Sequence, residues 1–268
     1  GHAEAILRAS APTGIVIGFD CDAEALELTR QRLGGFGDRL VLRHGRYEAL
    51  AELVGSPGGF DGVLFDLGVS SLQLDAADRG FSFTQSGPLD MRMDRGTGAT
   101  AAALLDRLSE RELADLIFEW GEERWSRRIA RAIVTARQDR SLATTTDLAA
   151  IVARSIPRRL WPRHIHPATR TFQAIRIAVN RELVELGSAL ENATHLLVPG
   201  GRAVAISFHS LEDRIVKQTW RRLEADGGVR VLTKRPITPG TAELSANPRS
   251  RSAKLRAVER PATAQEAA

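Results

Sequence analysis

Two patterns of apolar and polar positions alternate over the first 66 residues. Short apolar runs at Gly14–Asp20, Leu40–Leu42 and Phe60–Asp66 have the length of strands that a parallel sheet buries on both faces. The segment Ala23–Leu33 has apolar residues at helical spacing and is followed by two glycines, while Ala3–Ser10 is typical of the end of a helix. This alternation predicts a parallel, doubly wound α/β sheet.

Helical spacing dominates the middle of the chain, over Ala99–Leu197. Apolar residues recur at i, i+3 and i+4 in Glu110–Trp120, Arg124–Gln138 and Thr146–Ser155. The polar run Thr144–Asp147 supplies cap chemistry for the third of these segments. We therefore expect the sheet to be interrupted by an all-helical insert.

Strand character returns at Arg202–Ser207, after a turn that contains Pro199 and two glycines. A helix is predicted over Leu211–Glu224, and Val229–Leu232 with Leu255–Val258 predict a closing hairpin. The expected organisation has three parts, namely 1–98 as the first part of the sheet domain, 99–168 as the helical insert and 169–268 as the second part of the sheet domain.

Composition narrows the class of protein. With 268 residues, of which 43% are apolar, the chain can bury a large core. No stretch approaches the roughly 18 consecutive apolar residues of a membrane helix, and no basic leader precedes an apolar run. The single cysteine, Cys21, excludes a framework of internal disulfides and fits a reducing compartment. We expect a cytoplasmic protein with no membrane partner.

Charge is distributed unevenly along the chain. Residues 1–106 have 9 basic and 15 acidic side chains (net −6), residues 107–181 have 15 and 8 (net +7), and residues 182–268 have 13 and 10 (net +3). Nearly all of the 37 basic residues are arginine, which suits phosphates and stacked bases, although a GC-rich genome also enriches arginine. A basic middle on an acidic body favours a nucleic-acid partner.

Acidic and polar residues stand where the predicted strands end. Ligands of an open α/β sheet bind beyond the carboxyl ends of its strands, where Asp20, Asp66 and the run Ser207–Ser210 fall. An acid at such a position binds the ribose hydroxyls of NAD or of S-adenosylmethionine, so Asp20 is a candidate for cofactor binding. Asp66 is a candidate for chemistry, and the alternative is that it merely caps the following turn.

A long segment without regular pattern, Leu67–Asp94, follows Asp66. Its 28 residues include two phenylalanines and two methionines among polar residues. Loops of this length in a compact domain are usually functional or disordered, and disordered segments contain few aromatic residues. We therefore interpret the segment as functional.

Five strings of residues carry a family resemblance: GVLFDLGVSSLQLD, the pair RGFSF and GPLDMRMD, GEERWSRRIARAIV, HPATRTFQAIRIAVNREL and ISFHSLEDRIVK. In this order they resemble the bacterial 16S rRNA (cytosine-N(4))-methyltransferase family, MraW/RsmH. The resemblance implies a class I (Rossmann-like) methyltransferase sheet with an inserted helical domain. It also implies S-adenosylmethionine as cofactor. The substrate would be the exocyclic amine of a decoding-region cytosine in 16S rRNA, either free or within the small ribosomal subunit.

The resemblance also implies site residues. The family's cofactor contacts would fall on Gly1, His2, Asp20, Tyr47, Asp66 and Gln73. Phenylalanine is usual in the family where Tyr47 stands. The family also begins earlier, with a strand and a DGT-x-G-x-GGH loop, and Gly1 with His2 look like the end of that loop. We therefore expect the N-terminal strand, at the centre of the sheet, to be missing from this sequence; the alternative is that Gly1 and His2 are the remnant of a tag.

Chemistry on an exocyclic amine requires acceptors for its protons, because its lone pair is conjugated with the ring. We predict that Asp66 accepts one such hydrogen bond and that a backbone carbonyl within Leu67–Val69 accepts another. Positioning and desolvation of the amine then contribute more to the rate of methyl transfer than a strong base would. The sequence leaves the proton acceptor open among His209, Asp90 and Glu212, of which His209 is our candidate.

RNA binding is predicted for the segment that follows Asp66 and for the helical insert. Phe81 or Phe83 would stack on a flipped base when a mobile loop closes, and the alternative is that both rings pack the loop onto the body. Other candidates are arginines of the insert and its end: Arg124, Arg127, Arg128, Arg131, Arg154, Arg158, Arg159, Arg163, Arg170 and Arg176. The alternative for the first four is a solvated face paired with nearby glutamates: Glu119, Glu122 and Glu123.

Three rival functions predict other features. An NAD oxidoreductase requires a Gly-x-Gly-x-x-Gly turn, which is not found here. Methylation at ring carbon 5 requires a thiolate nucleophile, but Cys21 stands beside the presumed ribose-binding acid. A non-catalytic RNA-binding protein stays possible if the cofactor loop is truly absent. An oligomer is compatible with the sequence.

Overall fold

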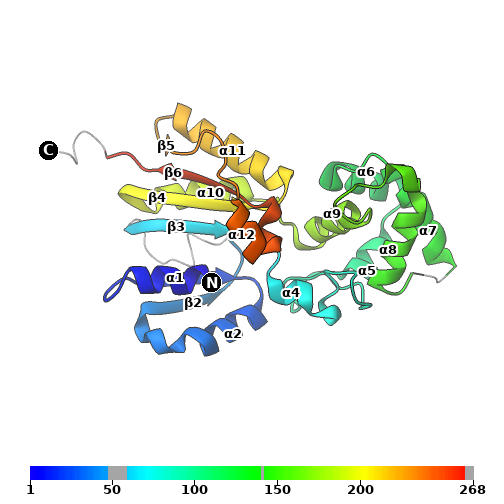
Figure 1. Cartoon of the computed structure of the whole chain (residues 1–268), viewed down its shortest axis with the longest axis horizontal. Coiled ribbons are helices and arrows are strands. Elements are labelled where there is room, and N and C mark those ends of the chain that lie inside the picture. Colours follow the sequence, from blue (N-terminus) through cyan, green and yellow to red (C-terminus); the bar gives the residue numbers. More distant parts are fainter. Residues whose placement is uncertain (48–58, 140–141, 263–268) are drawn as a thin grey trace. The chain divides into compact units, whose positions relative to one another are not determined.

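The computed structural model describes residues 1–47, 59–139 and 142–262 (Figure 1). The chain divides into two compact units, of which the first combines Gly1–Gly68 with Leu183–Ala268 and the second is Val69–Glu182. Within the described residues, no helix has both the length and the apolar character that a membrane crossing requires.

The first unit begins with a two-stranded parallel sheet. Strand β1 (Val16–Asp20) pairs with β2 (Leu40–His44), and the accompanying helices are α1 (His2–Ala9) and α2 (Ala23–Leu33). Asp22 caps α2, because its carboxylate accepts hydrogen bonds from two backbone N–H groups of the first turn. The predicted helix Ala23–Leu33 is confirmed residue for residue.

The second sheet of this unit has four strands in the order β3–β4–β6–β5. Strand β3 (Phe60–Asp66), confirmed as predicted, runs parallel to β4 (Leu197–Ser207). Strand β6 (Lys254–Glu259) runs antiparallel to β4 and to β5 (Arg230–Val231), as the predicted hairpin required. The strands predicted to be parallel form two parallel pairs, β1–β2 and β3–β4, which lie in separate sheets of the described structure. The strand patterns of the sequence fix neither the neighbour nor the direction of a strand.

Strand β4 starts five residues earlier than the sequence predicts, at Leu197 instead of Arg202. The turn residues Gly200 and Gly201 lie inside the strand, where the pairing with β3 shifts register. A Cβ on Gly201 would lie 2.8 Å from the carbonyl oxygen of Val198 and 3.0 Å from that of Phe60. Glycine is therefore needed at this position because neighbouring backbone atoms pack closely against it. From the sequence alone, the same glycine is interpreted as part of a turn.

Two helices pack with the four-stranded sheet and form the core of the unit. They are α10 (Leu186–His195) and α11 (Ser210–Ala225), and Figure 1 shows α11 lying along the sheet. Trp220 of α11 and Phe65 of β3 belong to the same buried apolar cluster. A short helix, α12 (Thr241–Ala246), lies in the connection between β5 and β6.

The second unit is helical in its regular structure. Its helices are α4 (Ser71–Asp75), α5 (Ala101–Arg107), α6 (Glu110–Gly121), α7 (Ser126–Gln138), α8 (Thr145–Ser155) and α9 (Thr169–Asn180). Ser109 and Thr144 form capping boxes at the starts of α6 and α8, which confirms the cap predicted at Thr144. Helix α7 begins at Ser126 and not at Arg124, because the chain between α6 and α7 turns through Glu122 in a left-handed conformation.

Candidate functional site

The candidate strand-end residues lie at the carboxyl ends of three strands. Asp20 ends β1, Asp66 ends β3, and Ser207 ends β4. Because β3 and β4 are parallel and Asp66 is in register with Ile206, Asp66 and Ser207 lie at the same edge of their sheet. This edge is where an open α/β sheet presents its ligand-binding residues.

Asp66 is paired with a residue from the start of the chain. The Nδ1 atom of His2 donates a hydrogen bond to Oδ2 of Asp66 over 3.0 Å. Their side chains are 54% and 49% exposed, respectively, so solvent screens the pair and leaves the carboxylate accessible. Gly1 is the N-cap residue of α1, so this helix places two predicted cofactor residues, Gly1 and His2, near Asp66.

Asp20 differs from Asp66 because it is largely enclosed. Its Oδ1 atom accepts a hydrogen bond from the backbone N–H of Asp22 over 2.8 Å. Burial raises the pKa of the Asp20 carboxyl, and the neighbouring charge of Asp22 adds to that effect while backbone hydrogen bonds oppose it. Tyr47, the other predicted cofactor residue of this region, packs against the core cluster of the same unit.

Gln73 has a local structural role in α4 of the second unit. Its side-chain oxygen accepts a hydrogen bond from the backbone N–H of Ser70 over 3.0 Å, and its own N–H donates to the Ser70 hydroxyl over 3.2 Å. This capping box buries Gln73 and fixes the first turn after the irregular Gly68–Ser70 connection.

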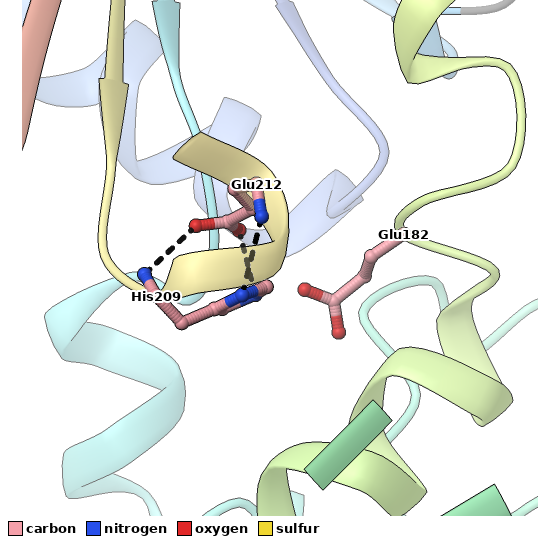
Figure 2. Close-up of side chains that lie close together, drawn as sticks. All are labelled: Glu182, His209 and Glu212. Atoms are coloured by element: carbon pink, nitrogen blue, oxygen red, sulfur yellow. Dashed lines mark hydrogen bonds and ion pairs between the residues drawn. The ribbon is translucent and has the colours of Figure 1, made fainter. Parts of the chain in front are cut away.

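His209 and Glu212 form the N-terminal cap of α11 (Figure 2). The N–H of Glu212 donates to Nδ1 of His209 over 3.4 Å, and the Glu212 carboxylate accepts from the N–H groups of Phe208 and His209 over 2.8 and 3.3 Å. Nε2 of His209 lies 3.2 Å from Oε1 of Glu212. The carboxylate of Glu212 is therefore occupied by the helix cap, and of this pair the imidazole is the more suitable proton carrier.

Asp90 is held by an arginine in the second unit. Oδ1 of Asp90 accepts from Nε of Arg92 over 2.7 Å, and Oδ2 accepts from Nη2 over 3.1 Å. Burial alone would raise the pKa of Asp90, but the hydrogen bonds and charge of Arg92 outweigh it and hold the pKa below its usual value. A carboxylate of lowered pKa is a weak base, so the structure disfavours Asp90 as the proton acceptor.

The two candidate stacking rings both have partners within the second unit. Phe81 is 7% exposed and lies under the guanidinium of Arg79, 6.0 Å from the ring centroid. The Phe83 ring contacts Phe172 edge to face, with centroids 4.8 Å apart, and His166 at 4.7 Å. These contacts favour the alternative in which the rings pack the segment onto its own unit.

Two buried polar side chains hold the segment around Met91 and Met93. Asn180 donates from Nδ2 to the Met91 carbonyl and accepts from the Met93 N–H through Oδ1, both over 2.7 Å. Arg79, which is 1% exposed, donates from Nη2 to the carbonyls of Arg92 and Met93 over 3.1 and 2.8 Å. A segment without secondary structure thus has its backbone groups satisfied by side chains.

The arginines in and just before α7 face solvent, as predicted. Among the residues that the structure describes, Arg124, Arg127 and Arg128 form no ion pair or hydrogen bond, while Arg131 lies 3.2 Å from Glu110. The predicted alternative paired these arginines with Glu119, Glu122 and Glu123, whereas the ion pair described for this cluster joins Arg131 to Glu110. The exposed arginines are therefore available to a polyanion.

Arg170 and Arg176 occupy different environments on α9. Arg170 is exposed and donates to the Glu122 carbonyl over 3.2 Å. Arg176 is largely buried and binds Glu182 through two hydrogen bonds of 2.8 Å each. A role for Arg176 at the target nucleotide would require exchange of this bidentate partner.

Comparison with known proteins identifies the family. The family model described as the MraW methylase family matches residues 1–261. The chain belongs to the MraW methylase family. It is 52% identical over 277 residues to a protein of Geobacter sulfurreducens named ribosomal RNA small subunit methyltransferase H, covering 97% of this chain and 89% of that protein. Proteins of the same name from Citrifermentans bemidjiense and Syntrophobacter fumaroxidans are each 50% identical over 277 residues, with 97% of this chain and 89% and 87% of theirs covered.

Membership of the MraW methylase family makes the chain a methyltransferase that uses S-adenosylmethionine. The environment of Cys21 agrees with a mechanism that needs no thiolate. Burial, followed by the charge of Asp20, raises the pKa of the Cys21 thiol to about 11. A nucleophilic cysteine requires the opposite shift.

Sequence reasoning missed several residues that shape this methylase. Asp22, Arg79 and Asn180 are buried polar residues, and each satisfies backbone groups. A polar residue within an apolar or irregular stretch was the available signal, because such a residue is buried only when it has a partner. The partners are distant in sequence, so the pattern alone did not reveal them.

Proposed function

We propose that the chain transfers the methyl group of S-adenosylmethionine to the exocyclic N(4) amine of a cytosine in the decoding region of 16S rRNA. Support comes from its family and from the names of its relatives, which are small subunit rRNA methyltransferases. The observation that carries the proposal is the half-exposed carboxylate of Asp66 at the end of β3, next to the end of β4.

The two sheets of the first unit are, in this proposal, parts of one class I methyltransferase sheet. Strands β1 and β3 each pair on one side in the described structure, with β2 and β4 respectively. A further parallel strand between β1 and β3 would satisfy both open edges. The helices of Val69–Glu182 would then form the inserted domain, for which the sequence predicts the boundaries 99–168.

The cofactor, when bound, supplies an electrophilic methyl group on a sulfonium. Asp20 would bind its ribose hydroxyls, since one carboxylate has about four acceptor sites and its hydrogen bond from Asp22 uses one of them. The Tyr47 ring would lie beside the adenine. The remaining contacts would come from Gly1, His2, Asp66 and Gln73.

Asp66 would orient the cytosine amine by accepting a hydrogen bond from one of its two protons. The carboxylate is acceptor-only when ionised, and it already has a donor in His2 that keeps its position defined. A backbone carbonyl within Leu67–Val69 would accept from the second proton, and His209 would take up the proton that is released. Removal of water from the closed site would add to this effect of positioning.

The RNA would contact the exposed arginines in and just before α7, and we propose the small ribosomal subunit as its setting in the cytoplasm. Because Arg124, Arg127 and Arg128 have no partner among the described residues, binding of phosphates there breaks no existing ion pair.

A methyl-transfer assay tests the proposed function. The chain would be incubated with radiolabelled S-adenosylmethionine and either free 16S rRNA or small subunits that lack the modification. Label in N(4)-methylcytosine after nuclease digestion is the expected result. Absence of label on both substrates from a protein that binds them would favour a non-catalytic RNA-binding protein.

A further inference from the structure

The first unit contains a cavity of about 180 Å³ that is separate from the strand-end acids. One wall is a face of α11, and the other is formed by β5, β6 and residues just after β5. The lining residues are Lys217, Trp220, Arg221, Glu224, Val231, Thr233, Lys234 and Arg256. The four from α11 are spaced i, i+3, i+4 and i+7, which places them on one side of the helix.

The position of the cavity along α11 separates it from the candidate catalytic residue His209. That residue caps the start of the helix, while the lining begins at Lys217 and ends at Glu224. With a rise of about 1.5 Å per residue, these positions lie about 12 to 22 Å along the helix from the cap. The cavity is therefore not a part of the strand-end site.

Positive charge predominates around this cavity. Its carboxylate, Glu224, accepts a hydrogen bond from the backbone N–H of Val231 over 2.8 Å, and Arg256 is paired with Asp213 over 2.6 and 3.2 Å. The other three lining cations make no ion pair or hydrogen bond with any residue in the described ranges: Lys217, Arg221 and Lys234. Such a set of unpaired cations selects an anion.

The choice of residue type at the cavity adds to this argument. Of the 37 basic residues in the chain, only Lys217, Lys234 and Lys254 are lysine, and two of these three line the cavity. An ammonium group is a compact charge with three donors, which suits a phosphate oxygen that has no fixed bidentate geometry.

Trp220 provides a second and independent indication of a ligand. Its side chain is 2% exposed, and its Nε1 is buried without a hydrogen-bond partner among the described residues. Buried indole N–H groups normally have an acceptor. Because Trp220 lines the cavity, an anion bound there is a candidate for the acceptor that Nε1 lacks among the described residues.

We propose that this cavity binds a phosphate group of the RNA backbone at a distance from the target cytosine. The proposal rests on the proposed function in taking the polyanion to be RNA. Lys217 is half-buried, whereas Arg221 and Lys234 are exposed at the rim, so one phosphate can enter while the flanking nucleotides stay in solvent. The cavity thus adds an anchoring point on the first unit to the arginines of the second.

RNA binding by a double variant, Lys217→Gln with Lys234→Gln, tests the proposal. Affinity for a 16S rRNA fragment should fall roughly tenfold, and the log–log salt slope should decrease by about 0.7 to 0.9 for each phosphate that is no longer neutralised. Affinity for S-adenosylmethionine should not change. The matched control is Arg235→Gln, an exposed neighbour outside the cavity, which should change RNA affinity less than about twofold. Equal effects of the double variant and the control, or no effect of the double variant, would overturn the proposal.

The indole N–H of Trp220 supplies a direct readout. The chain has 4 tryptophans, so the ¹⁵N-labelled protein gives few indole signals, and Trp220→Phe assigns the one required. The Trp220 signal should shift on addition of the RNA fragment and not with inorganic phosphate at the same phosphate concentration. A shift with inorganic phosphate alone, or with neither, would contradict an RNA-backbone site.

Methyl transfer by the unaltered protein separates the two proposals. If that protein binds the fragment and shifts the Trp220 signal but transfers no methyl group, the proposed reaction fails while the phosphate site stands. If it methylates the RNA and the double variant binds as tightly, the phosphate site fails while the reaction stands.

Discussion

The amide of Asn180 is predicted to hold the segment around Met91 and Met93 in place before any RNA is bound. Asn180 is 5% exposed, and its two short hydrogen bonds satisfy the Met91 carbonyl and the Met93 N–H. In Asn180→Ala both backbone groups would be without this partner in a buried environment.

The magnitude follows from the cost of leaving buried polar groups unsatisfied. Each such group costs about 1–3 kcal/mol, so the two backbone groups together give a local destabilisation of about 2–6 kcal/mol. Since about 1.4 kcal/mol corresponds to a factor of ten, the Met93 amide should exchange with solvent about 30-fold faster or more.

Hydrogen exchange monitored by NMR measures this local effect without assuming that the two units unfold together. Asn180→Asp retains an acceptor for the Met93 N–H but offers no donor to the Met91 carbonyl, so it should fall between the original protein and Asn180→Ala. Gln138→Ala, at the exposed end of α7, serves as the control and should leave the Met93 amide unchanged.

Unchanged exchange at Met93 in Asn180→Ala, with α9 still folded, would refute the reasoning. The segment would then be held by other contacts, and Asn180 would be dispensable. Faster exchange throughout α9 as well as at Met93 would also contradict a local clamp, because it would show that the helix itself depends on the amide.

Three further predictions concern charge. Replacing three α7 arginines by glutamine should weaken RNA binding and lower the salt slope by roughly 0.7 for each single-strand phosphate that is released, while sparing S-adenosylmethionine affinity by calorimetry; the variant is Arg127→Gln, Arg128→Gln and Arg131→Gln. Burial by itself would raise the pKa of the Asp213 carboxyl, but Arg256 and Lys254 have the stronger effect and lower this pKa below its usual value of 3.8. The paired carboxylate therefore stabilises the fold above pH 3.8, and this stabilisation is lost as the pH falls through the lowered pKa. Asp213→Asn should therefore flatten the acid limb of a pH-denaturation curve, and an unchanged limb would contradict this. Because the Cys21 pKa is about 11, alkylation of the native thiol should rise steeply only as the pH approaches that value, and rapid reaction at pH 8 would contradict the burial effect.

Local patterns in the sequence predicted local structure well. The strand Phe60–Asp66 and the helix Ala23–Leu33 are found with their predicted bounds, because a short apolar run, helical apolar spacing and flanking turn residues are short-range signals. Strand pairing was predicted less well. The separation of β1–β2 from β3–β4–β6–β5 depends on long-range hydrogen bonds that no local pattern encodes.

At the candidate site, too, local features were predicted from the sequence and long-range contacts were not. That Asp66 ends a strand followed from the sequence, but its hydrogen bond with His2 joins residues 64 positions apart and was not predicted. Glu212 was a candidate proton acceptor by residue type, whereas the structure engages its carboxylate in a helix cap. Residue type indicated which groups can react, and the partners of those groups required the fold.

Methyl transfer by Asp66→Asn tests the central claim most directly. Asparagine preserves the shape of the side chain and one acceptor oxygen, but it removes the charge and presents N–H donors where the cytosine amine also has donors. With folding checked by circular dichroism and cofactor affinity measured by calorimetry, single-turnover transfer of radiolabelled methyl to 16S rRNA should fall at least about a hundredfold, as expected for loss of an orienting group in the reaction. Near-normal turnover by the folded variant would contradict the assignment of Asp66 to the reacting amine.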